Sequence, residues 1–151
     1  SFQPALYPQP LDHYLWQQAQ EKNIPVIGLE NIHGQAQLLR SISMEEQVRE
    51  LINFGRNVRG ARRRLFKLSA LYAKGDASQL YQSIRRSNGS QRQQVLLQRN
   101  HSLTDALIAH IYKGSVFCAV GAGHLSGKYG MPALLAQAGF KVSLLSPKSN
   151  P

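Results

Sequence analysis

The chain has only one cysteine, few acids in its second half and no long hydrophobic run. A single thiol, Cys118, cannot form an internal disulfide, so cysteine usage leaves the compartment open and favours a small core residue. No segment approaches the roughly 20 apolar residues that a membrane-spanning helix needs, which predicts a soluble protein without a transmembrane segment. The sequence starts at Ser1 with no charged and apolar leader, so we expect any targeting segment to lie outside it.

The length of 151 residues, of which 42% are hydrophobic, predicts one domain over residues 1–151. Charge is uneven: residues 1–50 hold six acids and three bases, whereas residues 51–151 hold two acids and fifteen bases. A basic half of this kind attracts anionic partners, and nucleic acid is one candidate. The densest basic cluster is Arg56, Arg59, Arg62, Arg63, Arg64 and Lys67. Apolar residues recur at helical spacing between these side chains and no aromatic residues are interleaved with the arginines, so a solvated helix face is favoured and no specific nucleic-acid recognition is expected.

Three short apolar segments predict β-strands: residues 24–30, the run that starts at Ser115, and residues 140–145. Helical periodicity occupies residues 11–22, most of 35–112 and 131–138. A strand, a helix and another strand at this spacing are typical of a right-handed parallel unit. We therefore predict an α/β fold: a small, mostly parallel sheet of about three strands, with a large helical insertion at about 35–112 between the first and second strands.

The glycine-rich turn after the second apolar segment, Gly121-Ala-Gly-His-Leu-Ser-Gly-Lys128, is the strongest candidate for a site. Backbone amides of such a turn can bind a cofactor, which makes Gly121, Gly123 and Gly127 candidate cofactor-binding positions. A Walker loop fails at Ala122 and Tyr129, and the spacing and the lack of a later acid argue against a dinucleotide, so no nucleotide is expected.

His124 within this turn can act as a general base or a metal ligand, or it can simply cap a helix. The other histidines show no spacing that places two on one helical face. A catalytic zinc takes three protein ligands as a rule, so His124 together with Glu30 falls short and a further ligand must come from elsewhere. Glu30 itself ends a hydrophobic run, where a carboxylate needs a partner or a chemical purpose.

Four blocks of the sequence, taken in order, resemble the carboxyl-terminal half of the TraB/GumN family, which includes bacterial pheromone-shutdown proteins and is similar to the animal TIKI proteases. The blocks are Leu11-Asp12 with Leu15, Pro25 to Glu30 with Gln35, Gln98-Arg99-Asn100, and Val116 to Gly130. The family pattern has Glu-Arg-Asn where this chain has Gln98-Arg99-Asn100, and His33 stands where members often carry an acid. Another Gly-x-x-His motif opens family members, and none precedes Asp12, so the resemblance implies a truncated member that lacks half of the expected site.

The resemblance implies hydrolysis, most simply of peptide bonds, in which a divalent metal ion would be held by His124 and Glu30. Glu30, Arg99 and His124 are then the candidate catalytic residues, and Gln35 and Asn100 are further site candidates. A bound metal would acidify a water, with Arg99 stabilising the oxyanion or orienting Glu30. The implied partners are a peptide or protein substrate and either a second copy of the chain or the missing amino-terminal half, and the implied location is the cell envelope.

Two alternatives stay open. The same cleft can belong to a non-catalytic regulatory or ligand-binding module, and a nucleic-acid-associated basic protein is a weaker option that rests on charge alone. Each site residue also has a structural explanation, in which Glu30 and Arg99 form a buried ion pair and Gln35 and Asn100 satisfy helix ends.

Overall fold

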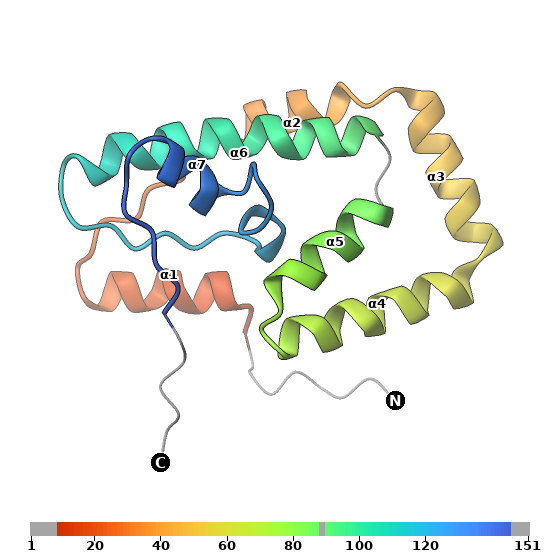
Figure 1. Ribbon diagram of the computed structural model, residues 1–151, viewed down its shortest axis with the longest axis horizontal. Helices are drawn as coiled ribbons and strands as arrows, with labels where there is room; N and C mark the ends of the chain where they lie inside the picture. Colours follow the sequence, from red (N-terminus) through yellow and green to blue (C-terminus); the bar gives the residue numbers. More distant parts are fainter. Residues whose placement is uncertain (1–8, 88–89, 146–151) are drawn as a thin grey trace, which may run out of the picture.

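The computed structural model describes residues 9–87 and 90–145 (Figure 1). Across this part of the chain the regular structure is helical and contains no strand. The elements are α1 (Leu11–Glu21), α2 (Ile32–Arg40), α3 (Met44–Arg56), α4 (Val58–Ala73), α5 (Ala77–Ser87), α6 (Ser90–Ile111), the short 3-10 turn η1 (Ala122–His124) and α7 (Met131–Gln137). None of the helices in the described part combines the length and the hydropathy of a transmembrane span.

Side-chain caps fix where several helices begin. The Ser43 hydroxyl accepts a hydrogen bond of 3.3 Å from the backbone N–H of Glu46, and Asp76 Oδ1 accepts one of 2.9 Å from the N–H of Gln79. Both bonds satisfy amide groups that a helix amino terminus otherwise leaves without partners. Ser43 and Asp76 therefore cap the amino termini of α3 and α5.

α6 is the central element of the fold, and α7 packs directly against it (Figure 1). The buried core consists of Leu103 and Leu107 of α6 with Met131 at the start of α7. Leu29, Ile111, Cys118, Val120 and Leu135 pack around this core and remain partly exposed. Apolar residues that precede α2 and that follow α6 thus meet on one side of α6, which places residues distant in sequence next to one another.

The predicted α/β fold is wrong for the described residues. Residues 24–28, 115–121 and 140–145 are irregular segments, and none pairs with another as a strand. A parallel sheet is stable only when its strands hydrogen-bond to neighbours and both faces are covered. These segments lack such cover, because Ile27 is 59% exposed, Phe117 81% and Leu144 94%. A β-like composition gives a segment only a local preference for the extended conformation. Among the described residues, no neighbouring backbone forms the hydrogen bonds that would pair these segments as strands.

The basic cluster at the end of α3 and along α4 faces solvent. All six side chains, Arg56, Arg59, Arg62, Arg63, Arg64 and Lys67, are exposed. Leu71 of α4 is buried, and α4 packs against α5. The arginines thus occupy the outer face of an amphipathic helix.

Candidate functional site

The site is centred on the middle of α6, where Arg99 and Asn100 occupy successive positions. Arg99 forms a two-pronged ion pair with Glu30: Nε donates to Oε1 at 3.1 Å and Nη2 donates to Oε2 at 2.9 Å. The two side chains are 24% and 21% exposed, so the pair lies mostly out of water. Parallel bonds of this kind fix the orientation of both planar groups.

Asn100 is the most deeply buried side chain of the site, at 1% exposure. Its Nδ2 donates a hydrogen bond of 2.7 Å to the backbone carbonyl of Tyr129, at the end of the glycine-rich turn. Its Oδ1 is bonded to Nδ1 of His124. The Thr104 hydroxyl, also buried, donates to the Asn100 carbonyl at 2.7 Å, which ties this turn of α6 together. One buried amide therefore holds both η1 and the loop that follows it against α6.

These contacts determine which nitrogen of His124 carries the proton. The carbonyl of Tyr129 can only accept, so the amide group of Asn100 faces it and the oxygen of Asn100 faces His124. That oxygen also only accepts, so Nδ1 of His124 must be the donor. In the neutral imidazole, Nε2 is then left as the basic nitrogen.

The surroundings of His124 favour the neutral form of its ring. Burial lowers the pKa of His124, and the positive charge of Arg99 lowers it further, while the carboxylate of Glu30 acts in the opposite direction. Both members of the ion pair are therefore close enough to His124 to influence its charge. The structure brings together Glu30, Arg99, Asn100 and His124 from four positions that the sequence had singled out.

The predicted cofactor-binding glycines have different structural roles. Gly127 has a φ of +88°, and a Cβ there would lie 2.6 Å from the Tyr81 ring, so both conformation and contact require glycine. Gly121 and Gly123 would place a Cβ 3.7 Å from His124 and 3.8 Å from Ile84, which are ordinary contact distances. The turn thus packs against α5 through Gly127, and cofactor binding by the three glycines stays a prediction.

Gln35 lies in α2, and its side chain is outside the described residues. Cys118 packs beside the core, and burial raises the pKa of its thiol, as expected for a small core residue.

Sequence reasoning gave Asn100 only a secondary role and did not identify Tyr129 or Thr104 as its partners. Asn100 directly follows Arg99, and Thr104 lies one helical turn further on, which is the spacing of a hydroxyl that bonds back to a helix carbonyl. This spacing of four residues could have identified Thr104 as a partner of Asn100 from the sequence. No sequence pattern indicates the contact with Tyr129, because it joins a side chain to a backbone carbonyl across 29 positions.

The donor atoms of the described residues fit the implied metal ion only in part. His124 presents an unprotonated Nε2, which suits a divalent metal, but both oxygens of Glu30 are engaged by Arg99. Within residues 9–87 and 90–145, no three His, Cys, Asp or Glu side chains gather as a ligand group. These residues therefore do not form a complete metal site by themselves, and a metal on His124 and Glu30 stays a prediction.

The site is therefore polar and lies between a helix and a glycine-rich turn, with a half-buried histidine held in one tautomer beside an arginine–carboxylate pair. The chain matches the TraB/PrgY/gumN family over residues 1–144, and it belongs to that family. The family resemblance drawn from the four sequence blocks is thus confirmed. No curated protein and no solved structure matches the chain.

Proposed function

We propose that this member of the TraB/PrgY/gumN family is a hydrolase of peptide bonds in which His124 moves the proton. The observation that carries the proposal is the bond from His124 Nδ1 to Asn100 Oδ1. It leaves Nε2 as an unprotonated base in a ring held by a buried amide. An unprotonated imidazole nitrogen held in this way is suited to accepting a proton from a water molecule.

In the proposed reaction, Nε2 of His124 takes a proton from water while the water oxygen forms a bond to the substrate carbonyl carbon. The carbonyl π electrons move to its oxygen and form a tetrahedral oxyanion. Collapse of this intermediate breaks the C–N bond, and His124 returns its proton to the leaving nitrogen. The products are a carboxylic acid and an amine, so atoms and charge balance.

Arg99 supplies the positive charge for the oxyanion in this scheme. Only Nε and Nη2 donate to Glu30, so the guanidinium has further N–H donors for the developing negative charge. Glu30 acts through Arg99 as a positioning residue, because its two oxygens hold the guanidinium in place. Asn100 has the same kind of role for His124.

Three related predictions accompany this proposal. A divalent metal ion is an alternative to this scheme: it would take His124 Nε2 as one ligand, with the remaining ligands supplied from outside the described cluster, and Nε2 would then hold the metal instead of accepting the proton. The cell-envelope location and the need for a second copy or an amino-terminal half follow from the family resemblance alone.

The test is cleavage of a library of quenched fluorescent peptides, read by fluorescence and by mass spectrometry of the products. We expect His124→Gln to reduce the rate by about 10² to 10⁴, the usual contribution of a general base. His13→Gln is the matched control, because His13 is an exposed histidine on α1. A chelator followed by addition of Zn²⁺ or Mn²⁺ tests the metal separately.

Cleavage that survives His124→Gln at the control rate would contradict the assignment of His124. If the folded chain cleaves no peptide with or without added metal, the non-catalytic ligand-binding alternative is favoured instead.

A further inference from the structure

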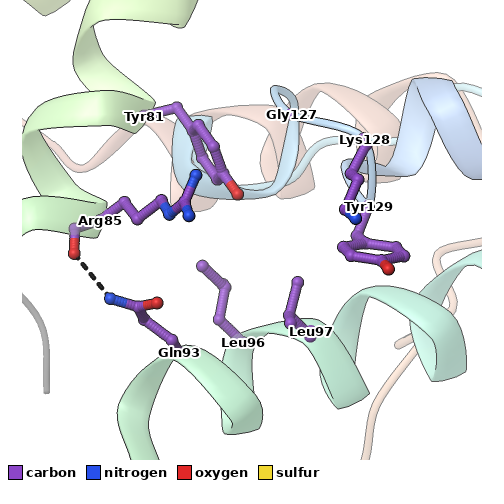
Figure 2. Close-up of a pocket in the computed structure, with 8 residues that line it drawn as sticks. All are labelled: Tyr81, Arg85, Gln93, Leu96, Leu97, Gly127, Lys128 and Tyr129. Carbon is purple, nitrogen blue, oxygen red and sulfur yellow. Dashed lines mark hydrogen bonds between the residues drawn. The ribbon is translucent and has the colours of Figure 1, made fainter. Parts of the chain in front are cut away.

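A cavity with a mostly apolar lining and two basic residues lies beside the site, one to two helical turns earlier on α6. It has a volume of about 200 Å³ and opens between α5, α6 and the glycine-rich turn (Figure 2). Tyr81 and Arg85 come from α5, Leu96 and Leu97 from α6, and Lys128 and Tyr129 from the turn. None of these side chains has a role in the proposed hydrolysis.

The charged groups of this cavity have one sign. Arg85 and Lys128 both line it, and no acidic residue does. Lys128 Nζ lies 4.7 Å from the centroid of the Tyr129 ring, which holds the ammonium group above an aromatic face. Two cations on one small cavity favour an anionic group of a ligand.

The remaining walls are apolar or aromatic. In Figure 2 the Leu96 and Leu97 side chains project from α6 toward the cavity, with the Tyr81 ring on the opposite side. Tyr81 is held there because its ring packs directly against Gly127, where no Cβ intervenes. Pockets for drug-sized ligands measure roughly 300 to 1,000 Å³, so this smaller cavity suits a ligand with one ring or one branched side chain.

Two hydrogen bonds hold the rim of the cavity, and one of them also orders the site. Gln93 Nε2 donates a hydrogen bond of 2.8 Å to the Arg85 carbonyl and joins α6 to α5. Tyr129 is held by the bond from Asn100 to its carbonyl. The cavity is therefore largely formed before a ligand binds, which reduces the entropic cost of binding.

We propose that this cavity binds a carboxylate that carries one aromatic or branched apolar group. Arg85 and Lys128 bind the carboxylate, and the apolar group lies between the Tyr81 ring and the two leucines. The carboxyl-terminal residue of a peptide and a free aromatic acid share this chemistry. The inference goes beyond the proposed function and does not depend on it, since binding requires no hydrolytic step.

The test is an NMR titration of the ¹⁵N-labelled chain with N-acetyl-L-phenylalanine, compared with the neutral N-acetyl-L-phenylalanine amide. We expect shifts at the amides of Leu97, Gly127 and Tyr129, and binding about tenfold weaker for the amide. Arg85→Gln and Lys128→Gln should each weaken binding of the acid about tenfold and leave binding of the amide unchanged. Arg86→Gln is the matched control, because Arg86 is an exposed neighbour on α5 that does not line the cavity.

Equal binding of the acid and the amide would overturn the proposal, and so would equal weakening by Arg86→Gln or no shift at the cavity amides. Circular dichroism of each variant shows whether it is folded, and Arg85→Lys, which keeps the charge, should retain more binding than Arg85→Gln. A tripeptide ending in phenylalanine distinguishes the two ligand sources: tighter binding than the single residue indicates a peptide terminus, and equal binding indicates a small acid.

Discussion

Nδ1 of His124 donates a hydrogen bond to Oδ1 of Asn100, and the same buried amide donates to the carbonyl of Tyr129. Asn100 of α6 thereby fixes both the orientation and the tautomer of His124 in the glycine-rich turn. The residue is 1% exposed, and its two partners are partly buried, so each partner would lose a hydrogen bond that water replaces only in part if the amide were removed.

Asn100→Leu should lower the free energy of unfolding by about 2 to 4 kcal/mol, because the Tyr129 carbonyl and the His124 N–H each lose a partner. Urea unfolding followed by circular dichroism measures the change. Thr104→Val, which removes a hydroxyl but leaves the amide of Asn100 in place, serves as the control and should cost about 1 kcal/mol. Equal losses in the two variants would contradict a special role of the Asn100 amide.

Asn100→Asp should raise the pKa of His124, because a carboxylate beside Nδ1 stabilises the imidazolium form. In the parent chain burial and Arg99 hold that pKa below its ordinary value. Long-range ¹H–¹⁵N NMR spectra of the imidazole measure the pKa and the tautomer together. The parent spectrum should show the proton on Nδ1, and a proton on Nε2 would contradict the tautomer assigned here.

The stability of the fold should depend on pH through His124. Its pKa is lower in the folded chain than in the unfolded chain, so the unfolded state takes up the proton first as pH falls. The contribution is fully present above about pH 6.5, the ordinary histidine pKa, and is lost as pH falls through the folded pKa. Urea unfolding at pH 7.5 and at lower pH should show a smaller loss for His124→Gln than for the parent chain. An identical pH profile for both would show that His124 does not titrate differently in the two states.

The Glu30–Arg99 pair should show strong coupling in a double-mutant cycle with Glu30→Gln and Arg99→Met. We expect a coupling energy of about 1 to 3 kcal/mol, because both bonds are charge-assisted and mostly shielded from water. Glu46 and Arg49 form the control pair, at 4.0 Å with an exposed arginine, and should couple by less than about 1 kcal/mol. Comparable coupling in the two pairs would argue against an ordered Glu30–Arg99 pair.

Gly127→Ala should destabilise the chain by about 1 to 2 kcal/mol, since a φ of +88° is costly for a residue with a Cβ. The new methyl group would also displace the Tyr81 ring, so the amide spectrum of the turn should change. Gly123→Ala is the control, because its Cβ would meet only Ile84 at 3.8 Å, and a change within about 0.5 kcal/mol is expected. Thermal unfolding and amide spectra of the two variants provide the comparison.

Much of the helical part of the fold could be predicted from the sequence. The first helix was expected over 11–22 and occupies Leu11–Glu21, and the helical periodicity expected over most of 35–112 includes the long helix α6 at Ser90–Ile111. Helices follow from local information, because their hydrogen bonds join residues four positions apart and their caps lie within a turn of the end. The sheet could not be settled in this way, since strand pairing depends on what lies beside each apolar segment.

The same distinction between local and non-local information applies to the candidate site. The sequence by itself determined which residues have chemistry to offer: a carboxylate after an apolar segment, an arginine on a helix and a histidine in a glycine-rich turn. Only the tertiary structure decided that Glu30 pairs with Arg99 across 69 positions and that Asn100 holds His124 across 24. Such contacts depend on how α6 packs against the segments before α2 and after α6, and no local pattern encodes that packing. The charge state of His124 follows from the same packing, because burial and the neighbouring ion pair exist only in the folded chain.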